Sequence, residues 1–383
     1  MKNNKRILLI TWNYPPKIGG MENLLYELVK QIRSSIIVKI IAPFSDESKE
    51  KQPKEIFRAR YKGLIWFFVF SFFKGSQLLR ADNYSAIVGG SALMTPIVYL
   101  LGKIHRKPGV IYAHGLDLIY DNILYQFVIK TLIPKIDLVV TNSSQTGQIA
   151  RNLGVAAGSI STVHPGIKTD DFDYSENNEG LKEKLGLGGK FVLLSVGRLA
   201  KRKGIPEFIK FSLPEIVKRH NNVVFCIIGG NPEKSLIHKL DIQQLIEKEI
   251  IERRLEDHVK LYGWVDREQL LQMYLACDIF ILPAIYVQDD VEGFGIVLAE
   301  ANAAGKPVVS TAIGGIQDAV ANNQGGILVE PENWEEYTEA IIKLIEDEAL
   351  RNEMGVFGSE RVKEEFDWPV IGRKFLGAID ALD

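Results

Sequence analysis

The sequence predicts an α/β protein made of two doubly wound lobes of parallel sheet. Short runs rich in isoleucine and valine alternate with amphipathic segments along most of the 383 residues. Such runs are typical of buried parallel strands, and the segments between them supply crossover helices. The alternation pauses once, in residues 168–189, which are rich in Asp, Glu, Asn and Gly. The length also exceeds that of one ordinary domain, so we expect two Rossmann-like domains.

The first lobe is expected to contain five strands and three helices. The strands are predicted at 6–11, 36–42, 85–90, 109–113 and 137–142, and the helices at 22–32, 95–104 and 119–133. Residues 168–189 are interpreted as a linker that includes a short helical turn at 181–187.

The second lobe repeats the pattern. Its strands are predicted at 191–196, 223–228, 259–262, 279–282, 308–310 and 326–329, and its helices at 205–217, 236–251, 268–276, 296–304 and 335–346. The tail, 350–382, has a helical pattern that Trp368-Pro369 breaks, and the final helix is expected to cross back to the first lobe. The predicted boundaries are therefore 1–167, 168–366 and 367–383. Ligands of open α/β sheets bind beyond the carboxyl ends of the strands, so a cleft between the lobes is expected to hold the site.

Bulk composition narrows the class of protein. The two cysteines, Cys226 and Cys277, lie in apolar surroundings and indicate a reduced, cytosolic protein. The longest apolar run, 64–73, is shorter than the ~20 residues that a membrane-spanning helix needs. Residues 1–165 carry 21 Lys and Arg against 10 Asp and Glu (21 − 10 = +11), and the remainder carries 25 against 38 (25 − 38 = −13). This split suggests that the first lobe faces an anionic partner.

The segment 292–300, Glu-Gly-Phe-Gly-Ile-Val-Leu-Ala-Glu, lies between a predicted strand and a predicted helix. Gly293 and Gly295 let the backbone approach a ligand, and the helix N-terminus offers free N–H groups. Glu300 stands in an otherwise apolar helix, where a carboxylate needs a partner such as the two hydroxyls of a ribose. A helix-capping acid with a solvated glutamate is the simpler alternative, but we favour a ligand site.

A basic turn, 195–204, follows the first strand of the second lobe and contains neither a G-x-G-x-x-G nor a Walker pattern. Arg198 is suited to a bidentate grip on a phosphate, and Lys203 to a point charge beside it. A solvated basic turn is the alternative. The position at the carboxyl end of a strand favours phosphate binding.

Two loops of the first lobe are weaker candidates. Gly19-Gly20 opens a predicted helix and would expose N–H groups to an anion or a sugar. His114 ends a predicted strand and is followed by glycine. A structural and a functional histidine are equally good interpretations of that position.

Metal and nucleic-acid sites are not predicted. The interior Asp171-Phe-Asp173 lies in the expected linker, and the six histidines show no ligand spacing. The basic residues do not form a known nucleic-acid-binding module. No nucleophile elbow is present.

Together these motifs resemble the large retaining glycosyltransferase family 4, which has the GT-B fold. The resemblance covers nearly the whole chain, and its most specific part is 292–300, which looks like the E-x7-E signature of the family. Further similar segments are 304–309, 314–318, 196–204, Gly19-Gly20, His114-Gly115 and 164–167. The chain departs from the family at Pro165 and Lys168, where Asn and Asp are more frequent, and this puts details of the hinge in doubt.

The resemblance implies that Arg198 and Lys203 bind the donor diphosphate and stabilise the leaving group, and that Glu300 binds the ribose hydroxyls. It favours front-face displacement with retention, in which the leaving phosphate helps to deprotonate the acceptor. Catalysis would then be electrostatic and positional, with the two cations replacing a metal ion. No cofactor is expected.

The remaining roles also follow from the resemblance. Glu292, with the amides of Phe294 and Gly295, would hold the donor sugar. His114 would line the reaction centre, and Gly20 would approach the phosphate or the acceptor. The expected catalytic residues are His114, Glu292, Arg198 and Lys203, and the expected donor-binding residues are Gly19, Gly20, Arg198, Lys203, Glu292, Gly293, Phe294, Gly295 and Glu300.

The expected function is transfer of a hexose from a nucleotide diphosphate sugar to a glycan or lipid-linked acceptor, in cell-surface polysaccharide or glycolipid synthesis. The sequences of 15–20 and 292–297 are similar to family members that use GDP-mannose, and UDP-sugars stay open. The alternatives are a nucleotide-sugar epimerase, a glycogen-phosphorylase type of enzyme, a non-catalytic nucleotide-binding protein, and a soluble small-molecule glycosyltransferase.

A cytoplasmic location is expected, with peripheral contact to the inner face of the cell membrane. Cations flank the aromatic run 64–73, and a basic, aromatic-rich helix can lie at the surface of an anionic bilayer. Burial against the first sheet is the alternative, because the run is apolar nearly all round. The flanking cations are Arg58, Arg60, Lys62, Lys74 and Arg80.

Overall fold

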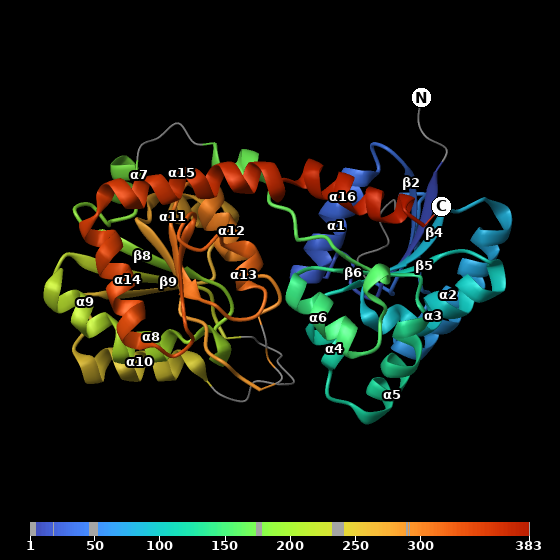
Figure 1. Cartoon of the computed structure of the whole chain (residues 1–383), viewed down its shortest axis with the longest axis horizontal. Helices are drawn as coiled ribbons and strands as arrows, with labels where there is room; N and C mark the ends of the chain where they lie inside the picture. Colours follow the sequence, from blue (N-terminus) through green and yellow to red (C-terminus); the bar gives the residue numbers. More distant parts are fainter. Residues whose placement is uncertain are drawn as a thin grey trace. The chain divides into compact units, whose positions relative to one another are not determined.

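Two parallel sheets, one in each half of the chain, organise the computed structural model (Figure 1). The structure describes residues 5–17, 19–45, 53–173, 178–231, 241–288, 290 and 292–382. The chain divides into one unit of Met1–Gly166 with Trp368–Asp383, and a second unit of Ile167–Asp367. These boundaries lie one residue from those expected at 167, 366 and 367.

The first sheet has seven strands in the order β3-β2-β1-β4-β5-β6-β7, all parallel. The order reverses between β1 and β4, which makes this the topological switch point where ligands bind in open α/β sheets. The strands are β1 (Arg6–Ile10), β2 (Ile37–Ala42), β3 (Ile56–Arg58), β4 (Ala86–Gly89), β5 (Gly109–Ala113), β6 (Leu138–Thr141) and β7 (Ile160–Thr162).

Helices cover both faces of this sheet. One core lies under α1 and α16, and the other lies under α2, α3 and α5. The helices of the first unit are α1 (Gly20–Ile32), α2 (Leu64–Ala81), α3 (Thr95–His105), α4 (Leu116–Ile119), α5 (Ile123–Leu132), α6 (Ser144–Asn152) and α16 (Trp368–Asp380). Short 3-10 turns are η2 (Ala92–Met94), η3 (Ile133–Lys135) and η4 (Ala157–Ser159).

The second sheet has six parallel strands in the order β10-β9-β8-β11-β12-β13, with its switch point between β8 and β11. The strands are β8 (Phe191–Val196), β9 (Val223–Ile228), β10 (Val259–Gly263), β11 (Ile279–Leu282), β12 (Val308–Thr311) and β13 (Gly326–Val329). The helices are α7 (Asn178–Lys184), α8 (Ile205–Phe211), α9 (Leu213–Arg219), α10 (Ile242–Arg253), α11 (Arg267–Ala276), α12 (Ile296–Ala303), α13 (Ile316–Ala319), α14 (Trp334–Glu346) and α15 (Glu348–Glu365), with 3-10 turns η5 (Thr169–Phe172) and η6 (Lys201–Lys203).

The last helix returns to the first unit, as expected from the break at Trp368-Pro369. Helix α16 packs beside α1 (Figure 1) and buries Phe375 in the core of the first unit. The ring of Trp368 lies against Gly166, where an added Cβ would come within 2.3 Å of it. Only glycine fits beneath the ring at that point.

The linker prediction for 168–189 is wrong. Within this stretch the described residues form η5 and α7, and Phe172, Leu181 and Leu187 are buried in the second unit. Their burial explains the difference, because a polar composition concealed three buried apolar residues, of which Phe172 and Leu187 join one core of the second unit. Residues 174–177 lie outside the described part.

Two predicted helices differ in the structure. The helix expected at 119–133 begins only at Ile123, because α4 ends at Ile119 and the Asn122 side chain caps the new helix by accepting from the Tyr125 N–H. The helix expected at 205–217 divides into α8 and α9, with Pro214 in the first turn of α9, where its missing N–H costs nothing. Strands β3 and β7 and helix α6 were not predicted. Helix α10 begins at Ile242, and residues 236–240 of the predicted helix lie outside the described part.

Candidate active site

The candidate residues of the second unit gather where the loops after β8 and β11 meet. The Ile285 N–H donates to the Arg202 carbonyl at 2.9 Å, which ties the two loops together. Gly204 is left-handed, with φ of 63°, and an added Cβ would lie 1.9 Å from the Pro283 carbonyl. The close approach therefore requires glycine, and it brings residues 202–203 beside Asp290 and Glu292 at the switch point of the sheet.

An ionic cluster of two cations and two carboxylates forms at this junction. The Arg202 Nη1 donates to Oδ1 and Oδ2 of Asp290 at 3.0 and 3.2 Å, and its Nε donates to Glu292 Oε2 at 3.2 Å. The Lys203 ammonium lies 3.0 Å from the same Glu292 oxygen. All four side chains are largely buried, and their formal charges cancel.

Glu292 and Arg202 keep their charges at neutral pH. Burial opposes the ionisation of Glu292, but the charges of Lys203 and Arg202 outweigh it and lower the pKa of this carboxyl to about 2. Burial also opposes the charge on Arg202, and the carboxylates of Glu292 and Asp290 still raise its pKa above the usual value. Glu292 is therefore an anion that can accept hydrogen bonds from sugar hydroxyls.

Arg198 and Lys203 line one small cavity under the loop after β8. Lys203 is buried, with its ammonium 3.7 Å from the place where a Cβ on Gly197 would stand. The Arg198 side chain is exposed, and within the described residues it makes no hydrogen bond or ion pair. Two cations, one held and one free to turn, thus stand at the carboxyl end of β8, which suits an anionic ligand.

Glu300 has protein partners, which the sequence did not reveal. Its Oε2 accepts from the Tyr274 hydroxyl at 2.9 Å, and Oε1 lies 3.4 Å from Arg267 Nη1. Arg267 also pairs with Asp171 at 3.0 Å. Burial raises the pKa of Glu300, and Arg267 only partly offsets this. Each carboxylate oxygen retains acceptor capacity, so the partners leave room for a diol.

The turn into α12 depends on two glycines. Gly295 caps the helix in the left-handed region, with φ of 79°, and an added Cβ on Gly315 would lie 2.0 Å from the Gly293 carbonyl. The Phe294 ring is buried and makes an edge contact with Phe366 at 5.4 Å between centroids. The aromatic side chain therefore serves the core, and only the backbone of Phe294 is suited to contact a donor.

In the first unit, the Gly19-Gly20 turn already holds a carboxylate. An added Cβ on Gly19 would lie 2.4 Å from Glu22 Oε2, and Asn13 Nδ2 donates to Glu22 Oε1 at 2.8 Å. Glu22 is buried, and its negative charge disfavours a phosphate beside Gly19. Nothing lies within 4 Å of an added Cβ on Gly20, so its predicted approach to a ligand stays a prediction.

His114 joins the ends of two neighbouring strands. Its Nε2 lies 3.0 Å from the carbonyl of Gly90, just after β4, and its own N–H donates to Asp117 Oδ1 at 2.8 Å. A carbonyl only accepts, so this bond places a proton on Nε2, and in the neutral ring Nδ1 is an acceptor. The ring also packs on Tyr112, with 4.9 Å between centroids.

The other sequence features have plain structural settings. Cys226 and Cys277 are free and buried, and burial raises their thiol pKa values to about 11 and about 12. Asp171 pairs with Arg267 and Lys168, and Asp173 lies 3.7 Å from Lys363. None of the helices in the described part of the chain is long and apolar enough to cross a bilayer.

Sequence reasoning identified Arg198, Lys203, Glu292 and Glu300 but missed the partners that hold Glu292 and Glu300. Arg202 and Asp290 had no predicted role, and the neighbouring Asp289 and Val291 lie outside the described part. Asp290 and Arg202 are distant in sequence, and the adjacency of β8 and β11 is the signal that places them together. His114 and the Gly19-Gly20 turn belong to the other unit, and the cleft expected between the units stays a prediction.

Comparison with known proteins decides the family. The model described as Glycosyltransferase Family 4 matches residues 18–171, and the model described as Glycosyl transferases group 1 matches residues 177–361. The chain belongs to glycosyltransferase family 4. The two matches follow one another and together cover most of the chain. This family 4 protein is therefore a glycosyltransferase, and the alternative of a nucleotide-sugar epimerase is excluded.

Curated relatives and solved structures agree with this assignment. A GDP-mannose-dependent alpha-(1-6)-phosphatidylinositol monomannoside mannosyltransferase of Mycobacterium tuberculosis is 25% identical over 98% of this chain and 99% of its own. A D-inositol 3-phosphate glycosyltransferase of Corynebacterium jeikeium is 26% identical over 87% and 78%. The structure of HepE from Anabaena with UDP and glucose has a TM-score of 0.77 at 22% identity, over 99% of this chain and 100% of that one. This last likeness shows the shared GT-B fold.

Proposed function

We propose that this family 4 protein is a retaining hexosyltransferase that needs no metal ion. It moves a hexose from a nucleotide diphosphate sugar, with GDP-mannose favoured over UDP-sugars, to a glycan or lipid-linked acceptor for cell-surface polysaccharide or glycolipid synthesis. The observation that carries the proposal is the ionic cluster of Arg202, Lys203, Asp290 and Glu292 at the switch point of the second sheet. Arg198 lines the same small cavity as Lys203.

The cations supply what a metal would supply to a leaving diphosphate. Lys203 and Arg198 stand at the carboxyl end of β8, where their charges offset the negative charge that develops as the glycosidic bond breaks. Glu292 is ionised and accepts hydrogen bonds from the sugar, while Glu300 accepts from the ribose hydroxyls. Fixed charges need no reorganisation at the moment of reaction, so front-face displacement proceeds by position and electrostatics.

The donor and acceptor are proposed from the relatives. The mycobacterial relative is named for GDP-mannose and for a phosphatidylinositol glycolipid, and it aligns with this chain almost end to end. The relative named for D-inositol 3-phosphate favours the second candidate function, transfer to a small soluble acceptor. The two functions differ in whether the acceptor is extracted with lipid or remains in water.

We also propose a cytoplasmic site of action with peripheral contact to an anionic membrane through α2. This helix buries Phe67 against the first sheet but leaves Ile65 and Phe73 79% and 68% exposed. One face of the helix is therefore buried, as the alternative interpretation expects, and the exposed face supports membrane contact as a proposal. The exposed face is suited to the apolar boundary of a bilayer.

The test is a transfer assay with the purified full chain and an excess of EDTA. Thermal shifts with GDP, UDP and their sugars select the donor, since the tightest ligand raises the melting temperature most. Release of nucleotide with a lipid extract, and an α-linked product from an α-linked donor, support the proposal. An inverted product, or activity that appears only after Mg²⁺ or Mn²⁺ is added, would contradict it, and transfer only to water-soluble polyol phosphates would establish the second function.

A further inference from the structure

The face of the first unit that carries α2 also carries α3 and α5, and the three helices form one continuous layer. Helix α3 packs against α2 on one side and against α5 on the other. Their inner sides contribute Phe67, Leu101 and Ile129 to a single core under the sheet. The outer sides of the three helices therefore share one surface of the unit.

Exposed apolar side chains form a stripe on each helix of this layer. They recur every four residues, the spacing that aligns side chains along one side of a helix. The stripes are Ile65, Val69 and Phe73 on α2, Leu100 and Ile104 on α3, and Ile123 and Phe127 on α5. Ile123, Leu124 and Phe127 are 90%, 72% and 67% exposed. More than half of the large exposed apolar side chains among the described residues come from 61–127, and such a concentration marks an interaction surface.

The charged side chains of the same layer are mostly cationic. Residues 59–135 contain nine Lys and Arg and three Asp, with no Glu, so the net charge is 9 − 3 = +6. Two of the aspartates have other partners: Asp82 pairs with Arg6 and Lys39, and Asp117 accepts the N–H groups of Ala92 and His114. A protein partner or a second copy of this chain would have to bring matching acidic groups, whereas an anionic bilayer offers negative charge beside an apolar interior.

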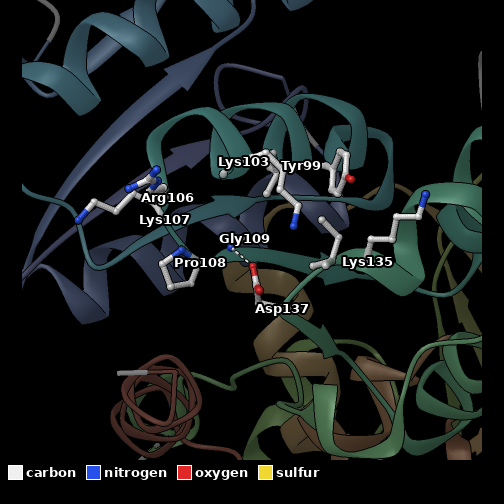
Figure 2. A pocket seen from close by; sticks show the side chains of 11 residues that line it. Tyr99, Lys103, Arg106, Lys107, Pro108, Gly109, Lys135 and Asp137 are labelled. Carbon is white, nitrogen blue, oxygen red and sulfur yellow. Dashed lines mark hydrogen bonds between the residues drawn. The ribbon is translucent and has the colours of Figure 1, made fainter.

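A basic pocket lies at the edge of this layer, at the amino end of the sheet. Its volume is about 350 Å³, and it lies between the ends of α3 and η3. Lys103 points into it, and Lys107 and Lys135 turn their ammonium groups outward on either side (Figure 2). The acid of the pocket, Asp137, accepts the Gly109 N–H at 2.8 Å. Cations at a helix C-terminus are common, but Lys135 comes from another element.

We propose that the outer face of α2, α3 and α5 docks on a bilayer containing anionic phospholipid, with Ile123, Leu124 and Phe127 entering the apolar boundary. The basic pocket takes the phosphate of one headgroup through Lys103, and Lys107 and Lys135 reach its neighbours. This docking surface rests on the proposed membrane contact of α2 and extends it to two further helices and a headgroup site. Apolar contact and charge act together, so binding persists in part at high salt.

Flotation of the full chain with vesicles tests the docking surface. The vesicles contain phosphatidylcholine alone or an equal mixture with phosphatidylglycerol, at low and at high salt. We expect binding to the anionic vesicles and at least a tenfold loss of partitioning for Ile123→Ser/Leu124→Ser/Phe127→Ser, and a similar loss for Lys103→Glu/Lys135→Glu. Ile251→Ser and Lys218→Glu, which change exposed residues of the second unit, are the matched controls and should bind as the unchanged chain does.

Further arms separate this proposal from the proposed function. Phe127→Ser alone keeps the test valid if the triple variant does not fold, and unchanged thermal stabilisation by nucleotide verifies the fold of each variant. If Ile65→Ser/Trp66→Ser abolishes binding while the α5 and pocket variants bind normally, α2 contact survives and the three-helix surface is overturned. No binding of the unchanged chain to anionic vesicles overturns both. A dimer in sedimentation velocity that the α5 variant dissociates, without vesicle binding, assigns the face to a second copy and also overturns the proposal.

Discussion

Arg202 donates from one Nη1 to both carboxylate oxygens of Asp290 while its Nε donates to Glu292. The planar guanidinium thus holds Glu292 through Oε2, the same oxygen that the Lys203 ammonium approaches at 3.0 Å. When Lys203 turns toward a diphosphate, Glu292 would lose one of its two cations. Arg202 remains, and Asp290 holds the guanidinium in place. Arg202 is therefore inferred to be a positioning residue for Glu292.

Arg202→Ala is expected to lower both stability and turnover. Breaking a largely buried ion pair costs about 3–5 kcal/mol, and misplacing a sugar-binding group costs turnover of roughly 10²-fold. Arg202→Lys should recover part of the stability but little turnover, because an ammonium does not span both carboxylates. Thermal unfolding and separate kcat and KM values measure this. A normal kcat in Arg202→Ala, with Arg219→Ala as the exposed control, would remove the positioning role.

We expect the substitution Glu300→Gln to have opposite effects on the melting temperature of the free protein and on its stabilisation by nucleotide. Its folded-state pKa is raised above the usual 4.5, so ionised Glu300 costs stability as pH rises through the folded pKa. Glu300→Gln should therefore raise the melting temperature of the free protein at pH 7 and reduce the further rise caused by donor nucleotide. Nucleotide affinity of the unchanged chain should fall as pH decreases toward and below the raised pKa, while Glu292, at about 2, stays ionised. An unaltered nucleotide shift in the variant would show that Glu300 does not bind the ribose.

We expect an alanine at Gly204 to clash with the backbone, and Gly186 offers a control position with a similar φ. Gly204 and Gly186 both have φ near +65°, but only at Gly204 would a Cβ meet a backbone oxygen. Gly186→Ala should cost about 1–2 kcal/mol for the left-handed backbone, and Gly204→Ala about 1–3 kcal/mol more. Urea unfolding measures the difference in the free energy of unfolding. Equal losses at the two sites would mean that the loops after β8 and β11 do not approach as described.

We expect a substitution of His114 to lower turnover without lowering the stability of the protein. Gln at this position can keep a donor for the Gly90 carbonyl but lacks the ring acceptor at Nδ1, whereas Ala loses both. We expect His114→Gln to unfold near the normal temperature and to lose turnover, with nucleotide affinity unchanged because the proposed diphosphate and ribose contacts, Arg198, Lys203 and Glu300, lie in the second unit. If His114→Gln is fully active, the histidine is structural.

Much of the fold follows from sequence because the central strands are buried on both faces. The predicted 109–113, 191–196 and 223–228 match β5, β8 and β9, which are apolar apart from Ser195 in β8. The edge strands β3 and β7 are only half-buried and three residues long, so they show no such run. Tyr120–Asn122 breaks a helical pattern that continues across it, and only the cap by Asn122 marks the division.

Some residues of the candidate site could likewise be predicted from the sequence, and others could not. Glycines and charges that follow strands were visible in sequence, which identified Arg198, Lys203 and the 292–300 segment. Their partners were not visible, because Arg202 meets Asp290, and Tyr274 meets Glu300, only through the order of strands and helices in the second unit. Glu22 was missed for a related reason, since its carboxylate turns back onto Gly19 from the first turn of α1.

The most direct measurement is the initial rate of glycosyl transfer by the unchanged chain and by Lys203→Ala, each with EDTA and with added Mg²⁺. Lys201→Ala, an exposed lysine two residues away, is the matched control. We expect EDTA to leave the unchanged chain fully active, Lys203→Ala to lose about 10²–10³-fold in kcat in either buffer, and Lys201→Ala to behave normally. A rate that collapses in EDTA and returns with Mg²⁺, or a near-normal rate for Lys203→Ala, would contradict metal-independent transfer driven by this lysine.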